Sequence, residues 1–257
     1  MDHAELTKQE FARQADRFAT ASAVTGEDLT QRIVDALGTD AEGTVLDVAC
    51  GPGIVSAALA RRARAVVALD ITPAMLAQAQ TRCAAAGLRN VTFREGSATA
   101  LPFVDAAFDA VVTRLSLHHF PEPAQALAEI ARVLRPGGAC VVADIVSSED
   151  AEESALHNAI EVLRDPSHVR MLPASELRAL VAGAGLAVAA ESAWEQPRGF
   201  EEWAAIVDDP ARIAPLRPVV RALAAGGRHA GFGLALREGT VTFVHRWLLI
   251  SARKPMA

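Results

Sequence analysis

Short β-branched runs alternate with longer segments rich in alanine, leucine and arginine between Gly43 and Ser147. This alternation is typical of strand–helix units on a parallel sheet. It predicts strands at Thr44–Ala49, Ala65–Leu69, Val91–Arg94, Phe108–Thr113 and Ala139–Val146, and helices at Ile54–Arg62, Pro73–Ala86 and Pro123–Leu134. The middle of the chain is therefore predicted to be doubly wound α/β, with a turn at 135–138 before its fifth strand.

The pattern changes on either side of this core. Two helices are predicted ahead of it, at Leu6–Ala19 and at Gly26–Leu37 with Thr25 as N-cap, where they could cover the open edge of the sheet. After Ser148 the pattern predicts helices at Glu149–Leu163 and Pro173–Ala184, which we interpret as an inserted helical lid. A strand at Leu186–Ala193, a loop-rich stretch from Gln196 to Glu238 and an antiparallel final strand at Thr240–Ala252 complete the expected fold.

Composition narrows the class of protein. The 257 residues are 51% hydrophobic and 22% charged, which is typical of a single globular domain. The net charge of −6 argues against nucleic acid as a partner. No apolar run approaches ~20 residues and the N-terminus lacks a basic region, so we expect a soluble, cytoplasmic protein without membrane insertion. Three cysteines without a CxxC pair predict neither disulfides nor a metal site, but small buried apolar residues.

A glycine-containing turn carries the first chemical signal. Gly51 and Gly53 connect a buried strand to a helix, which is typical of a turn that lets a ligand approach the backbone, although a plain strand-to-helix turn would look the same. Asp70 follows Gly53 by 17 positions at the end of the next strand, near the ~20-residue interval of an acid that binds ribose hydroxyls. Asp47 interrupts the first apolar strand and Ser56 replaces a third glycine, and both features disfavour a nicotinamide site.

Six motifs occur in a fixed order within the core, at Leu46–Gly53, Ala68–Leu76, Glu95–Phe103, Phe108–Val112, Leu117–Phe120 and Glu129–Gly138. With them the chain resembles the class I S-adenosylmethionine-dependent methyltransferases, in particular the bacterial small-molecule branch related to the ubiquinone/menaquinone C-methyltransferases. The resemblance covers residues 44–146 and implies a Rossmann-like fold with S-adenosylmethionine as cofactor. Residues 190–257 carry little of it.

The resemblance also implies roles for individual residues. The methionine part of the cofactor would lie against Ala49, Gly51 and Gly53, with its amino group near Asp47. Asp70 would hold the ribose hydroxyls, and the adenine would lie between Ile71 and Met75. The adenine amino group would meet Gly96, Ser97 and Ala98, where the family usually has an acid in place of Ser97. Arg114 and Leu115 would pass the reactive end of the cofactor.

Methyl transfer needs few protein groups, because the reactive group belongs to the cofactor. A general base is expected only where the acceptor carries a proton. His119 is the preferred candidate and His118 the second, although one of them could pack and the other cap a helix. Asp144 is a third candidate or a solvated strand end.

Further candidate residues concern the acceptor side of the site. Arg164, His168 and Arg170 could attract an acidic substrate, or could offset the acidic residues at 149–153. The candidates for the pocket wall are aromatic and could equally be core: Phe11, Phe18 and Phe120.

We therefore expect one methyltransferase domain, composed of N-terminal helices (1–40), a cofactor-binding core (43–147), a helical lid (148–185) and substrate-side elements (186–257). It would transfer a methyl group to a small-molecule acceptor by in-line displacement, as a monomer or homodimer. A nicotinamide-dependent oxidoreductase and a non-methylating relative that keeps the cofactor fold are the alternatives.

Overall fold

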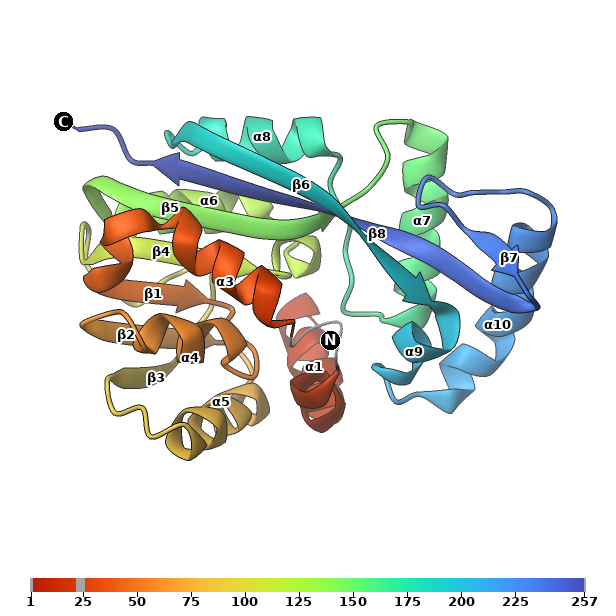
Figure 1. Cartoon of the computed structure of the whole chain (residues 1–257), viewed down its shortest axis with the longest axis horizontal. Coiled ribbons are helices and arrows are strands. Elements are labelled where there is room, and N and C mark those ends of the chain that lie inside the picture. The colour runs from red at the N-terminus through yellow and green to blue at the C-terminus, as the bar shows by residue number, and fades with distance from the viewer. Residues whose placement is uncertain (1, 22–25, 257) are drawn as a thin grey trace.

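One mixed sheet dominates the computed structural model, which describes residues 2–21 and 26–256 (Figure 1). In these residues the strands lie in the order β3-β2-β1-β4-β5-β8-β6, and β7 pairs with β8. The strands are β1 (Thr44–Val48), β2 (Ala65–Asp70), β3 (Val91–Glu95), β4 (Phe108–Arg114), β5 (Leu134–Val146), β6 (Ala187–Gly199), β7 (Ala235–Arg237) and β8 (Thr240–Arg253). The pairs among β1 to β5 are parallel, whereas β8 is antiparallel to β5, β6 and β7. The predicted α/β fold with an antiparallel final strand is confirmed.

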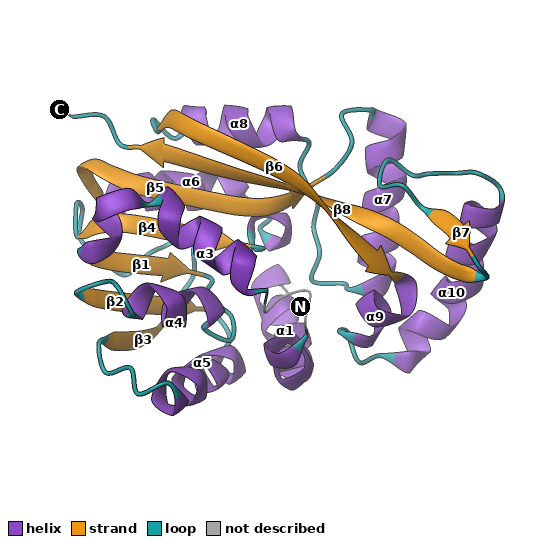
Figure 2. Ribbon diagram, viewed as in Figure 1, coloured by secondary structure: helices purple, strands orange, loops and turns teal. Residues whose placement is uncertain are grey.

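Helices cover both faces of the sheet (Figure 2). They are α1 (His3–Thr20), α3 (Glu27–Ala36), η1 (Gly38–Glu42), α4 (Ile54–Ala60), α5 (Pro73–Ala85), η2 (Leu117–His119), α6 (Pro123–Val133), α7 (Ala151–Arg164), α8 (Ala174–Gly183), α9 (Phe200–Ala205) and α10 (Pro210–Ala225). On one face, Ile33 of α3 and Leu59 of α4 are fully buried in a cluster with strand residues. On the other face, Ile130 of α6 and Val181 of α8 are buried in the same way. This apolar burial holds the sheet rigid below its strand ends.

A second lobe is built on the long outer halves of β6 and β8, where α7, α9, α10 and β7 gather (Figure 1). Its apolar cluster includes Trp203, Leu216 and Phe243. The expectation of a loop-rich stretch from 196 to 238 is therefore wrong. Pro215 and Pro218 lie inside α10 and hide its helical pattern, although Leu216 and other residues spaced along one side of the helix are buried.

Helix α1 lies between the two lobes, not along an edge of the sheet as expected (Figure 1). Gln78 Nε2 of α5 donates to Asp16 Oδ1 of α1 at 2.7 Å. This bond links α1 to the first lobe, which consists of β1 to β5 and the helices that cover them. Arg17 Nη2 contacts Asp208 Oδ1 at 2.8 Å, which ties it to the second. Helix α3 packs on a face of the sheet, and the predicted N-cap at position 25 lies outside the described residues. Together the contacts with both lobes hold α1 across the carboxyl ends of the strands.

Two further boundaries differ from expectation. Helix α6 leads directly into β5 at Leu134, so the predicted turn at 135–138 lies inside the strand, where Gly137 has φ +75°. Helix α8 packs against α6 and buries Leu177 in the sheet cluster, so this half of the expected lid covers the sheet. Helix α7 belongs to the second lobe, where Ile160 joins its apolar cluster (Figure 1).

The three cysteines are buried and unpaired, as predicted. Within residues 2–21 and 26–256, no helix has both the length and the apolar character needed to cross a membrane.

Candidate functional site

A cleft lies at the carboxyl ends of β1, β2 and β4, beneath α1. It consists of two adjoining cavities, which we together call the strand-end cleft, and the residues shared by both are Thr7, Ala49, Ile71, His119 and Phe120. One end is lined by Asp47, Gly51 and Arg114, and the other by Gly96, Ser97 and Ala98. The position is the usual ligand site of doubly wound sheets, because parallel strands end together there.

The glycine turn forms one wall of the strand-end cleft. Ala49, Gly51 and Gly53 have φ values of +55°, +53° and +73°. A Cβ at Gly51 would meet no atom within 4 Å, so its backbone faces open space. A Cβ at Gly53 would lie 2.6 Å from Ala79 Cβ of α5. Gly51 therefore leaves room for a ligand, whereas Gly53 allows the turn to pack against a helix.

Asp47 is buried at the inner end of the cleft, with 1% of its surface exposed. Ser56 Oγ donates a hydrogen bond of 2.5 Å to its Oδ2. Burial raises the pKa of Asp47 to about 7, while the Ser56 hydrogen bond and the charge of Arg114 oppose that rise. Ser56 is thus the partner of a buried carboxyl, which explains why a glycine is absent at this position.

Asp70 connects β2 to the glycine turn. Its Oδ2 accepts from the Gly51 N–H and its Oδ1 from the Thr72 N–H, both at 2.8 Å. Burial raises the pKa of Asp70, and these backbone hydrogen bonds work against the rise. Each carboxylate oxygen can accept more than one hydrogen bond, so the group can still bind hydroxyls of a ligand in the cleft.

The remaining cofactor candidates lie along the same cleft. Met75 is buried beside Ile71. Ser97 Oγ accepts from the Thr99 N–H at 3.2 Å and lies 2.9 Å from Thr99 Oγ1, so its hydroxyl is already used in a local turn. An adenine amino group would therefore meet a less available oxygen here than a carboxylate would offer.

Asp144 of β5 organises the loop that follows β4. Its Oδ2 accepts from the Leu117 N–H at 2.9 Å, and its Oδ1 lies 2.6 Å from His118 Nδ1. Leu115, at φ +51°, starts this loop. Asp144 is 3% exposed, so the idea of a solvated strand end is wrong.

The two adjacent histidines occupy different environments. Burial lowers the pKa of His118, but the charge and hydrogen bond of Asp144 outweigh it and leave the pKa raised. His119 Nδ1 donates to the Ser167 carbonyl at 3.0 Å. Burial and the charge of His118 lower the pKa of His119 to about 4. The preference for His119 as a base is therefore not supported by its environment, since a base works best with a pKa near the operating pH.

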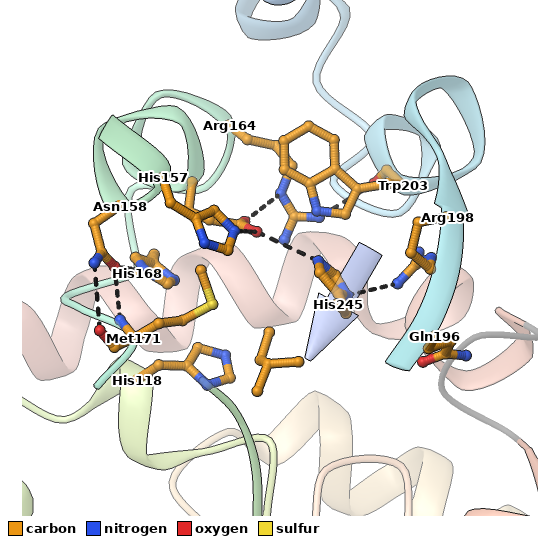
Figure 3. A network of polar contacts seen from close by, with 12 residues as sticks. His118, His157, Asn158, Arg164, His168, Met171, Gln196, Arg198, Trp203 and His245 are labelled. Atoms are coloured by element: carbon orange, nitrogen blue, oxygen red, sulfur yellow. Dashed lines mark hydrogen bonds and ion pairs between the residues drawn. The ribbon is translucent and has the colours of Figure 1, made fainter. Parts of the chain in front are cut away.

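A further cavity, the inner chamber, adjoins the strand-end cleft at His119, Leu115, Phe11 and Phe18. Phe11 and His119 meet edge to face, with ring centroids 4.8 Å apart. The chamber is also lined by Trp247 of β8, which pairs with Ile145 of β5. It continues to residues from the second lobe, namely Glu161, Arg164, Arg198, Trp203, Ile206 and His245. Figure 3 shows several of these side chains around one polar network. The predicted aromatic wall is present, with Phe120 lining the strand-end cleft.

The expected cationic cluster does not form. Arg170 is exposed and pairs with Glu176 at 2.5 Å. Arg164 contacts buried Glu161, with 3.3 Å between Nε and Oε2, and His168 Nε2 donates to Asn158 Oδ1 at 3.0 Å. These three side chains therefore neither form an anion site nor offset the acidic residues at 149–153.

The sequence pattern did not predict the residues that line the chamber from the second lobe. Glu161, Arg198, Trp203 and His245 are buried although three of them are titratable. One signal was available, since His245 interrupts an apolar strand at an inward-facing position. Among the described residues, no group of histidines, cysteines and carboxylates could hold a metal ion.

Known proteins share this architecture. Residues 46–142 match the family described as a methyltransferase domain. The chain is 34% identical over 178 residues to an uncharacterized methyltransferase of Bacillus subtilis, YcgJ, covering 69% of this chain and 70% of that protein. It is 40% identical over 154 residues to the demethylmenaquinone methyltransferase of Renibacterium salmoninarum, covering 56% and 63% of the two chains. The solved structure of Bacillus subtilis YcgJ aligns with a TM-score of 0.81 at 27% identity, covering 89% of this chain and 98% of that one.

Proposed function

This chain belongs to the methyltransferase-domain family and is an S-adenosylmethionine-dependent methyltransferase, and from that membership we propose that it methylates a small molecule by in-line displacement. The observation that carries the proposal is the junction of two cavities at His119. The strand-end cleft suits an elongated cofactor, and the inner chamber suits an acceptor that meets the cofactor at this junction.

The residues of the strand-end cleft fit S-adenosylmethionine. Gly51 leaves open space beside its backbone, Asp70 offers carboxylate oxygens for ribose hydroxyls, and Ile71 and Met75 supply an apolar surface for the adenine. Asp47 would lie near the amino group of the methionine part. When bound, S-adenosylmethionine supplies the methyl group, so the protein's task is alignment and exclusion of water.

His118 is the base that the geometry favours. With its Nδ1–H directed to Asp144, its Nε2 is left to accept a proton from an acceptor in the inner chamber. The buried Asp144 stabilises the protonated ring that results. His119 keeps its Nε2 as a hydrogen-bond acceptor, because its Nδ1–H is used by the Ser167 carbonyl. It would therefore orient the acceptor at the junction.

Helix α1 would exclude water from the reaction. Phe11 and Phe18 line both the strand-end cleft and the inner chamber, so a displacement of α1 would open the two together. Its polar ties to both lobes, through Asp16 and Arg17, would hold it closed.

Ligand-dependent thermal unfolding tests the proposal. S-adenosylhomocysteine at 100 times its Kd should stabilise the chain by about 2.7 kcal/mol, whereas NAD should not. Incubation with S-adenosylmethionine and a small-molecule extract should then yield a product that is heavier by one methyl group. Stabilisation by NAD alone would contradict the cofactor assignment.

A further inference from the structure

The wall of the inner chamber that lies away from the strand-end cleft is polar but electrically balanced. Arg164 Nε lies 3.3 Å from Glu161 Oε2, and Arg198 Nε lies 3.4 Å from Glu202 Oε2. Arg198 also donates to His245 Nδ1 at 3.2 Å, and His245 Nε2 faces Glu161 Oε1 at 3.6 Å (Figure 3). The two cations of this wall are thus both compensated by carboxylates.

The other ionisable groups of the chamber are neutral or are already hydrogen-bonded within the protein. Asp165 accepts from Gln14 Nε2 at 3.1 Å and from Ser167 Oγ at 2.6 Å. Burial raises the pKa of Asp165, but the nearby charge of Arg164 and these hydrogen bonds outweigh it and leave the pKa lowered. Burial lowers the pKa of His168 to about 2, so its ring is neutral. A charged ligand entering this buried space would lose its hydration, and each charged group that it meets already has partners within the protein.

Trp203 lines the same wall and carries a hydrogen-bond donor, its indole N–H. The residue is 2% exposed and lines the chamber, yet its Nε1 has no hydrogen-bond partner among the described residues. The Arg164 guanidinium lies 4.4 Å from the centre of its ring and donates to its carbonyl at 3.2 Å, so the indole is held in place. In Figure 3 the ring lies beside Arg164 and above His245. An indole N–H only donates, so its natural partner is an oxygen atom of a ligand.

Apolar side chains line the chamber together with this donor and the histidines. Ile145 and Trp247 are buried in one cluster, and both line the chamber together with Ile206. A bound molecule would therefore need an apolar body between its two polar ends.

We propose that the methyl acceptor is an uncharged molecule with an apolar body, and that Trp203 binds an oxygen atom at the end remote from the methylated atom. This proposal rests on the proposed function, which places methyl transfer at the junction. Carboxylates, phosphates and amines would be excluded because the charged groups of the chamber already have partners within the protein, and Trp203 would determine specificity without taking part in the chemistry.

Three phenols that differ only in their para substituent test the charge requirement. Calorimetry would compare 4-hydroxyacetophenone, which is neutral, with 4-hydroxybenzoate and 4-hydroxybenzylamine, with and without saturating S-adenosylhomocysteine. The neutral phenol should bind at least ~10-fold more tightly than either charged one. Equal or tighter binding of a charged phenol, or no binding of the neutral one, would overturn the proposal. Failure of S-adenosylhomocysteine to bind would contradict the cofactor assignment alone, because binding of the phenols is also measured in its absence.

Two variants test the proposed roles of Trp203 and Glu161 in ligand binding. Trp203→Phe removes the N–H and keeps a ring, so 4-hydroxyacetophenone should bind about 3- to 10-fold more weakly. Trp194→Phe is the matched control, because Trp194 is only partly buried and lies under Arg32, and it should leave the affinity unchanged. Glu161→Gln leaves Arg164 without its carboxylate, so 4-hydroxybenzoate should gain at least ~10-fold relative to the neutral phenol. An unchanged order of affinities in Glu161→Gln would overturn the charge argument.

Discussion

His118 Nδ1 lies 2.6 Å from Asp144 Oδ1, and both side chains are buried. The same carboxylate accepts from the Leu117 N–H, so one residue of β5 holds both the loop and the ring in place. Because the pair raises the pKa of His118 while His119 beside it has a pKa of about 4, two neighbouring histidines are suited to different tasks.

The pH dependence of turnover should identify the base. If neutral His118 accepts the proton, turnover rises with pH through its raised pKa and then levels off. His118→Gln should lower the plateau by ~10²–10⁴-fold and leave cofactor affinity nearly constant, whereas His119→Gln should cost less than about 10-fold. Initial rates across pH would measure this. The reverse order of effects would restore His119 as the base.

Asp144→Asn provides the companion experiment. It removes the charge that raises the pKa of His118, so the midpoint of the pH profile should move to lower pH.

The pair of His118 and Asp144 should also contribute to the stability of the fold. This contribution should be complete at pH values below the ordinary pKa of histidine and should be lost as the pH rises through the raised pKa of His118. Unfolding measured at several pH values in both proteins would test this sign.

Asp70→Ala should weaken binding of S-adenosylhomocysteine by ~1.5–3 kcal/mol, or about 10- to 100-fold, because hydrogen bonds to a charged group are lost. Asp105→Ala is a suitable control, since its ion pair with Arg132 lies at the surface, with 77% of the Asp105 side chain exposed. Calorimetry on folded protein would measure both. Unchanged affinity in Asp70→Ala would remove the ribose assignment.

Alanine substitutions at Gly51 and Gly53 should have different effects on stability and on cofactor binding. Gly53→Ala places a Cβ against Ala79 at a positive φ, so the free energy of unfolding should fall by about 2–4 kcal/mol. In Gly51→Ala the new methyl group meets open space, so the free energy of unfolding should fall by only about 1–2 kcal/mol. The methyl group would enter the cleft, however, and weaken cofactor binding. Denaturant unfolding and calorimetry separate the two effects. Equal cofactor affinity in wild type and Gly51→Ala would contradict its place in the site.

Ser97→Asp should leave binding of S-adenosylhomocysteine intact or tighten it. A carboxylate can accept from the Thr99 N–H, as Ser97 Oγ does, and keep a second oxygen for the adenine amino group. Ser97→Ala, which offers no oxygen, is the control. A clear loss of affinity in Ser97→Asp would show that the adenine lies elsewhere.

Gln14→Ala should loosen α1 over the reaction site. The buried bond from Gln14 Nε2 to Asp165 Oδ2 would be lost, lowering the free energy of unfolding by ~1.5–3 kcal/mol. Turnover should fall more than cofactor affinity, because the lost bond joins α1 to Asp165, which lines the inner chamber and not the strand-end cleft. Gln9→Ala, on the exposed side of the same helix, should change stability by less than about 0.5 kcal/mol. Equal losses of turnover and cofactor affinity in Gln14→Ala would mean that α1 only supports the fold.

The core and its strand-end cleft could be predicted because their signals are local in the chain. Each strand and the helix after it lie within about 30 residues, and the turn with Gly51 and the acid at Asp70 follow strands directly. Parallel strands bring their carboxyl ends to one edge, so local positions are enough to place these residues together.

The inner chamber depended on contacts between distant segments. Gln14 meets Asp165 across 151 positions, and Arg198 meets His245 across 47. Hydrophobic periodicity reports which side of an element is buried but not which other element covers it. The proposed choice of His118 over His119 depends on contacts of the same kind, because adjacent residues share a sequence context and the position of Asp144 on the next strand distinguishes them.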